Sequence, residues 1–300
     1  MTPGNGTSDV GLATCGKIAL LADSGNEINR LLDGVLAGEN WRVRRVPDNL
    51  AALIMATANH VDLIVTTWKD PKPENLEVLH KMRKVRPNAP LVILADRFTP
   101  GDVLEAMREG AFGYFSPPIE HEQLVEMVRE AIASPRWHDG IEVLSGTPSQ
   151  MSVTARCDIQ TAHRLVQFLR GIKEPNIPEA DREAVVTAFR EILLNAMEYG
   201  GHFDPRQHVE ISFSYTRSTV SCRIKDSGEG FSFQEIRHAA VSSPAGDLCS
   251  HAVVREEKGL RPGGFGVLIA KRLVDKLIYN KKGNDVLLVK YIKPTASHTV

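Results

Sequence analysis

The first cluster of residues with the types and spacing for chemistry is Glu191-x-x-x-Asn195. Apolar periodicity predicts an amphipathic helix that begins near Pro178 and is stopped by two glycines. Residues four apart lie on one helix face, so the carboxylate and the amide are neighbours. The Asn195 amide oxygen suits a hard cation such as Mg²⁺, and the Glu191 carboxylate can take a proton. The alternative is a core-packed helix with a solvated polar face.

The second cluster is Asp226-x-Gly228-x-Gly230, at the end of a predicted strand. A buried carboxylate there would accept a hydrogen bond from an exocyclic amine, which selects adenine over guanine. Gly228 and Gly230 would let the backbone approach a base closely. Taken alone, this sequence is more often an ordinary turn.

The third cluster is Gly264-Phe265-Gly266, which precedes a helix predicted over residues 267–276. The free N–H groups and the dipole at the start of a helix attract phosphate. A short glycine pattern is weak evidence by itself, because glycines commonly open helices. The order and spacing of all three clusters are far more specific than any one of them.

A long, weakly patterned stretch, 232–262, separates the second cluster from the third. A loop of this length is unusual between a strand and a helix unless it is a lid. It carries Lys258, with Arg255 and Arg261, and these cations would close over bound phosphates. The ordinary alternative is that they are solvated.

Composition limits the class of protein. The chain has 300 residues, a formal net charge of −1 and 42% hydrophobic residues, which favours about two soluble domains and gives no support for direct nucleic-acid or membrane binding. Residues 1–16 lack a signal-peptide pattern and are predicted to be a disordered lead-in, so we expect a cytoplasmic protein. The widely spaced cysteines indicate thiols rather than disulfides or a zinc site: Cys15, Cys157, Cys222 and Cys249.

Alternating elements predict that residues 17–133 form one α/β domain with a doubly wound, flavodoxin-like parallel sheet. Strands are predicted at 17–22, 41–46, 61–67, 90–95 and 113–116, and helices at 26–38, 76–85, 102–109 and 120–133. Punctuating residues place a linker at 134–150.

Residues 151–293 are predicted to form an α+β domain with helices layered on one side of a mixed sheet, followed by a tail at 294–300. Residues 151–157 are predicted as an edge strand and 159–171 as a helix. A hairpin across 216–219 is predicted to join two alternating strands, and the last two strands are predicted at 277–279 and 286–292.

The first domain resembles the receiver domain of two-component response regulators. The resemblance rests on Leu21-Ala-Asp23, on 61–67 and on 109–118. Key positions depart from the family pattern: Thr67 replaces the phosphorylated aspartate, Asp23 alone remains of the acidic pair, Ala95 replaces the switch hydroxyl and Pro117 replaces the lysine.

Phosphorylation of the usual kind needs a carboxylate with cations beside it. These departures therefore predict a pseudo-receiver that serves as a docking or dimerisation surface. Asp70 is the alternative acceptor, but it lies in a turn-like sequence.

The second domain resembles the Bergerat ATP-binding fold, and among its members the anti-sigma-factor serine kinases. Glu191-x-x-x-Asn195, Asp226-x-Gly228-x-Gly230 and the third cluster match its boxes. The sequence departs from the family at Tyr199, where histidine is frequent, and at Val267, where leucine is frequent.

The resemblance implies an ATP-dependent protein serine/threonine kinase, with Asn195 on Mg²⁺ and Glu191 at the acceptor hydroxyl. Its partner would be an anti-anti-sigma protein with a STAS domain, and it would sequester a sigma factor or another regulator. The resemblance also implies a homodimer, and we expect the pseudo-receiver to act as the input domain.

Two alternatives stay open. The first is a non-catalytic module in which ATP orders the lid and so controls a partner surface. The second is an atypical histidine kinase with His163 as the phosphoacceptor. His163 lacks the acidic residue and the proline that follow the acceptor in that motif.

Overall fold

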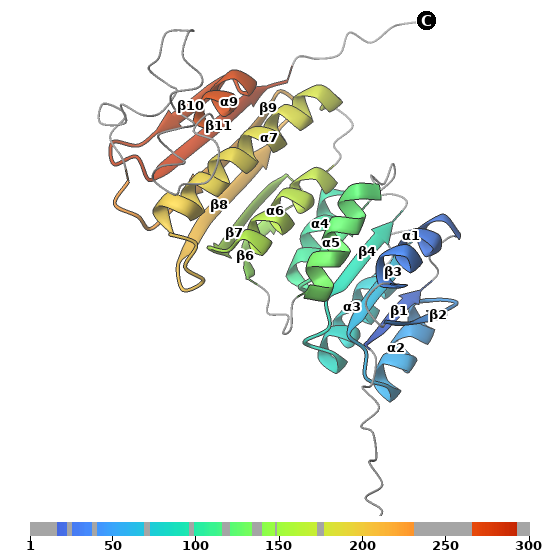
Figure 1. Ribbon diagram of the computed structural model, residues 1–300. Helices are drawn as coiled ribbons and strands as arrows, with labels where there is room; N and C mark the ends of the chain where they lie inside the picture. The colour runs from blue at the N-terminus through green and yellow to red at the C-terminus, as the bar shows by residue number, and fades with distance from the viewer. Residues whose placement is uncertain are drawn as a thin grey trace, which may run out of the picture.

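The computed structural model (Figure 1) resolves the chain into two domains. The residues that it describes are 17–22, 26–37, 41–68, 73–95, 99–115, 121–133, 140–147, 149–172, 177–230 and 266–292.

A parallel sheet with the strand order β2-β1-β3-β4-β5 forms the centre of the first domain. The sequence prediction of a doubly wound α/β domain is confirmed. The strands are β1 (Ile18–Ala22), β2 (Arg42–Val46), β3 (Leu63–Trp68), β4 (Leu91–Ala95) and β5 (Gly113–Phe115). The helices are α1 (Asn26–Leu36), α2 (Asn49–Ala58), α3 (Pro73–Val85), α4 (Pro100–Arg108) and α5 (His121–Ala133).

Helix α2 was not predicted from the sequence. Its sequence, NLAALIMATA, is apolar almost all round, so no polar face marks the helical period. Asp48 fixes its start, because its side chain accepts a hydrogen bond from the Ala51 N–H at 2.7 Å. A capping box of Thr99 and Asp102 fixes the start of α4 in the same way.

An antiparallel sheet with the order β10-β11-β9-β8-β7-β6 forms the second domain. Helices α6, α7 and α9 cover one face of it (Figure 1), which confirms the predicted two-layer α+β architecture. The prediction of a mixed sheet is wrong, because all five strand pairs that the structure describes are antiparallel. The strands are β6 (Ile141–Thr147), β7 (Gln150–Arg156), β8 (His208–Tyr215), β9 (Thr219–Lys225), β10 (Lys276–Tyr279) and β11 (Asp285–Tyr291). The helices are α6 (Ile159–Gly171), α7 (Glu179–Asn195) with a π-helical turn (Ala196–Gly200), and α9 (Gly266–Leu273).

Buried and exposed residues alternate along the strands, which gives the sheet an apolar face. In β8, Val209, Ile211 and Phe213 are buried, and the residues between them are exposed or half-buried. The predicted hairpin of β8 and β9 is confirmed, with Tyr215 opposite Val220.

Strand β6 corrects the predicted linker. Residues 141–147 lie within the predicted 134–150 linker but pair with β7. As a result β6 is the edge strand, and β7, predicted as the edge, lies between β6 and β8. The glycine, serine, threonine and proline residues at 145–149 hid this strand, because they are typical of turns.

The two domains share a buried interface in which Arg164 of α6 is the central residue. Arg164 is only 1% exposed, its Nε donates to the Phe112 carbonyl at 2.9 Å, and its Nη2 donates to the Ala111 carbonyl at 2.8 Å. Phe168 of α6 packs beside Tyr114 of β5, with ring centroids 6.4 Å apart. One hydrophobic core therefore continues from the receiver-like sheet into the second domain.

Two predicted thiols, Cys157 and Cys222, are buried and free. Cys15 and Cys249 lie outside the described residues. Among the helices that the structure describes, none combines the length and the apolar character needed to cross a bilayer.

Candidate functional site

Helix α7 and the start of α9 bring the first cluster next to Gly266, the one residue of the third cluster that the structure describes. A Cβ added to Gly266 would lie 2.7 Å from Glu191 Oε2 and 3.5 Å from Asn195 Nδ2. A side chain at this position would displace the Glu191 carboxylate from the start of α9. A residue of α7 itself also holds the Glu191 carboxylate, because Oε1 accepts a hydrogen bond from Arg190 Nη1 at 3.0 Å.

The second cluster packs on the end of the same helical segment. A Cβ added to Gly200 would lie 2.2 Å from the Asp226 Cγ, and one added to Gly228 would lie 2.7 Å from the Gly200 Cα. The Gly228 N–H donates to Asp226 Oδ1 at 2.9 Å. The structure therefore brings Glu191, Asn195 and Asp226 to one region of the second domain, as the three boxes predict.

Asp226 lies in an environment that opposes its charge. Burial raises the pKa of its carboxyl, while the Gly228 N–H and the charge of Lys282 act in the opposite direction. Oδ1 is engaged by the Gly228 N–H, which leaves Oδ2 to meet a ligand. A half-buried carboxylate with one oxygen already fixed is well suited to select a hydrogen-bond donor such as an exocyclic amine.

Gly230 adopts a conformation that requires glycine. Its φ is +78°, and an added Cβ would lie 1.9 Å from the Lys282 carbonyl oxygen. The loop that follows Asp226 is therefore pressed against the turn between β10 and β11.

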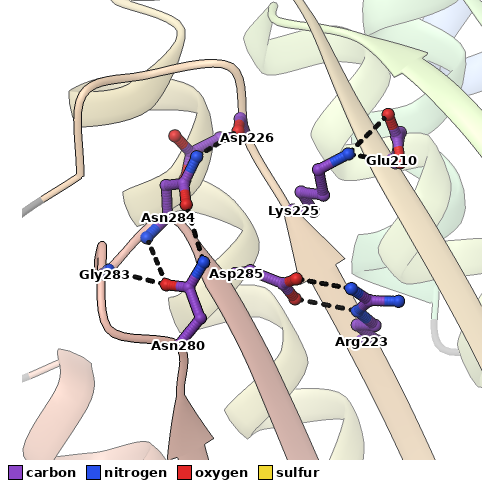
Figure 2. A network of polar contacts seen from close by, with 8 residues as sticks. All are labelled: Glu210, Arg223, Lys225, Asp226, Asn280, Gly283, Asn284 and Asp285. Carbon is purple, nitrogen blue, oxygen red and sulfur yellow. Dashed lines mark hydrogen bonds and ion pairs between the residues drawn. The ribbon is translucent and has the colours of Figure 1, made fainter.

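That turn also holds the Asp226 loop through a polar network (Figure 2) that the sequence analysis missed. Asn284 is buried, and its Nδ2 donates to the carbonyls of Asp226 at 3.1 Å and Gly228 at 3.3 Å. The Asp226 N–H donates in return to the Asn284 carbonyl at 3.0 Å. Asn280 Oδ1 fixes the turn by accepting from the N–H groups of Gly283 at 2.6 Å and Asn284 at 3.2 Å.

Asn284→Ala is expected to reduce the free energy of unfolding by about 1–3 kcal/mol, because two carbonyls lose a buried partner. ATP affinity should fall with it, since Asp226 loses its support. Arg223→Met is the matched control. It removes an exposed pair with Asp285 in the same network, and such pairs contribute about 0–1 kcal/mol. The measurements are urea unfolding and nucleotide titration of both variants. Equal losses of unfolding free energy and of ATP affinity in the two variants would contradict the account.

Several predicted site residues lie outside the described residues. They are Lys258, Gly264 and Phe265, together with Arg255 and Arg261 of the proposed lid. Their roles stay predictions.

In the first domain, Thr67 lies near the end of β3, beside a polar contact that the sequence did not indicate. The buried Thr66 hydroxyl donates to Asn49 Oδ1, and Asn49 Nδ2 donates to the Thr67 carbonyl at 3.4 Å. Ala95 is buried at the end of β4. Asp23, Asp70 and Pro117 lie outside the described residues, so the loss of phosphorylation stays a prediction.

Comparison with known proteins assigns both halves. Residues 19–129 match the response regulator receiver domain, and residues 153–290 match the histidine kinase-like ATPase domain. The chain therefore joins a receiver domain to a histidine kinase-like ATPase domain. This pair of domains is that of an ATP-binding regulator.

The curated relatives match through the receiver half. The DNA-binding transcriptional regulator NtrC of Rhizobium meliloti is 27% identical over 122 residues, which cover 40% of this chain and 25% of that protein. The transcriptional regulatory protein GlrR of Escherichia coli is 22% identical over 148 residues, which cover 47% and 33%. The chain thus spans only a quarter to a third of the length of these two relatives.

Solved response regulators are similar to the same half. One from Thermotoga maritima is 17% identical with a TM-score of 0.36, and the match covers 40% of this chain and 99% of that one. One from Burkholderia multivorans is 24% identical with a TM-score of 0.35, and the match covers 41% and 99%.

Proposed function

We propose that this protein is an ATP-dependent protein serine/threonine kinase of the anti-sigma-factor type. Its substrate would be a serine or threonine of an anti-anti-sigma protein with a STAS domain. The observation that supports catalysis most directly is the position of Glu191, a half-buried carboxylate one helical turn from Asn195 and against the start of α9. A protein that only binds ATP has no need of a carboxylate there.

The residues present fit Mg²⁺ and ATP. Asn195 offers an amide oxygen to the cation, which Mg²⁺ accepts beside phosphate oxygens and water. Asp226 would bind the adenine amine, and the glycines at 200, 228 and 266 allow the close contacts that hold Asp226 and Glu191 beside the same helical segment. The first N–H groups of α9 would face the phosphates.

Mg²⁺·ATP supplies the phosphoryl group. In this proposal the acceptor hydroxyl oxygen forms the new bond to the γ-phosphorus, the bond to the β–γ bridging oxygen breaks, and ADP leaves. Glu191 orients the hydroxyl and takes its proton. Arg190, hydrogen-bonded to Glu191, keeps that carboxylate in place.

The receiver domain would be the input. Its α4 and β5 pack against β6 and α6 of the ATPase domain, and α6 in turn packs on α7, which carries Glu191 and Asn195. A partner that docks on the receiver can therefore bias the ATP site through packed elements. A homodimer, a sequestered sigma factor and a cytoplasmic location belong to the same proposal.

His163 is a poor phosphoacceptor by its surroundings. Its Nδ1 is engaged with Glu130 of the receiver domain, and α6 packs on β5 and α4 of that domain. These contacts argue against the histidine kinase alternative.

Glu191→Gln is expected to lower phosphoryl transfer by about 10²–10⁴-fold with ATP binding retained. The measurement is transfer from radiolabelled ATP to a purified STAS-domain protein. Glu183→Gln is the matched control on the same helix, because Glu183 is 44% exposed and lies a turn or more from the site. Unchanged transfer by Glu191→Gln would remove this role. Tight ATP binding without transfer to any partner would favour the non-catalytic module.

A further inference from the structure

The domain interface carries a second cluster of chemically competent side chains, remote in sequence from the ATP site. Glu126 and Glu130 lie four residues apart on α5, so they project from one face of that helix. His163 approaches them from α6 of the other domain. One donor atom from each of the three residues lies within 4.8 Å of the other two.

The donor set has the chemistry of a metal site. Imidazole nitrogen and carboxylate oxygen both bind Zn²⁺ at about 2.0–2.2 Å, which places neighbouring tetrahedral ligands about 3.3–3.5 Å apart. His163 Nδ1 lies 2.5 Å from Glu130 Oε1, so a bound ion would replace this hydrogen bond with a bond to each of the two atoms. Three protein ligands leave one position for water or for a ligand from a partner.

Charge and exposure also fit a cation. Glu126 is exposed, and Glu130 and His163 are half-buried, so an ion can enter from solvent. Two carboxylates and one neutral imidazole would together bind the divalent ion. On the ATPase side, the positive charge of Arg190 opposes a bound cation. Its guanidinium is paired with Glu191.

We propose that Glu126, Glu130 and His163 bind a divalent first-row transition-metal ion, of which Zn²⁺ is the test case, between the receiver and ATPase domains. The ion would join α5 to α6 beside an existing contact between the domains, in which Gln160 Nε2 donates to the Glu130 carbonyl at 3.2 Å. Its binding would therefore stabilise the interface between the domains.

The test is calorimetric titration of the nucleotide-free full chain with ZnCl₂, repeated with CoCl₂ to record the visible absorption of bound Co²⁺. The wild-type protein should take up one more equivalent of Zn²⁺ than His163→Gln or Glu126→Gln. Loss of one of three ligands should weaken that site at least about tenfold. Zn²⁺ should also raise the thermal midpoint of the wild type and not that of the variants.

His80→Gln is the matched control, because His80 Nδ1 lies 2.8 Å from Glu109 Oε2 in a similar pair without the second carboxylate. It should keep the full Zn²⁺ uptake. Equal uptake and equal thermal shift in the wild type, Glu126→Gln and His163→Gln would overturn the proposal, as would no uptake by the wild type. The site does not depend on ATP, so either result leaves the proposed kinase activity untouched.

Discussion

Asp226→Asn is expected to lower the affinity of the full chain for ATP by roughly 10- to 100-fold while leaving the fold intact. The reason is the Gly228 N–H, which already takes the acceptor Oδ1. Asparagine has one acceptor oxygen. If that oxygen keeps the contact with Gly228, the amide N–H₂ must face the adenine amine, and two donors then oppose each other.

The same change should not reduce the stability of the nucleotide-free protein. Burial raises the pKa of Asp226 in the folded state, so the folded protein holds the ionised carboxylate at a cost. That cost is absent below the unfolded-state pKa, about 4, and grows as pH rises through the raised folded-state pKa. As pH rises from the unfolded-state pKa through the folded-state pKa, the wild type should therefore lose stability relative to Asp226→Asn.

Urea unfolding at several pH values, together with ATP titration, measures both effects. Asp204→Asn is the control, because Asp204 is paired with the exposed Arg206 and belongs to none of the three clusters. The account would be contradicted if Asp226→Asn bound ATP as well as the wild type does, or if Asp204→Asn lost the same affinity.

Arg164→Met is expected to reduce the free energy of unfolding by about 2–4 kcal/mol, the largest effect on stability that we predict. Methionine fills much of the same space but donates no hydrogen bond. The carbonyls of Ala111 and Phe112 would then lose a charged donor in a buried place. The contacts of the guanidinium with the rings of Phe112 and Phe168 would be lost as well.

Because Arg164 connects two domains, its loss should also change how the protein unfolds. We expect the single transition of the wild type to separate into two in urea, since the receiver and ATPase domains would no longer support each other. Arg170→Met on the same helix is the control, because Arg170 is 31% exposed and its nearest acidic partner, Glu183, is 3.9 Å away. A shift of equal size in both variants would contradict a special role for Arg164.

Local pattern and spacing were enough to predict the two domains and the helix on which Gly266 and the Asp226 loop pack. Asp226 follows a strand with clear alternation, and Glu191 and Asn195 lie four apart on a long helix that buries several apolar residues. These signals are local in sequence. The glycines mark places where two segments of the chain come close together, because an added Cβ would meet atoms of the neighbouring segment.

The supporting residues could not be predicted because their roles arise from contacts distant in sequence. Asn284 reads as an ordinary turn residue, yet it holds the backbone of Asp226, 58 positions earlier. Arg164 reads as a helix surface residue, yet it is buried against a domain that begins far upstream. Strand β6 has the composition of a linker and becomes a strand only by pairing with β7.

The most direct test of the central claim is calorimetric titration of the full chain with ATP, ADP and GTP in the presence of Mg²⁺. If the three clusters form one adenine-nucleotide site, the chain should take up one equivalent of ATP or ADP and bind GTP at least about tenfold more weakly. Asn195→Ala should weaken ATP binding. The absence of any uptake, or equal binding of ATP and GTP that Asn195→Ala does not change, would contradict the account.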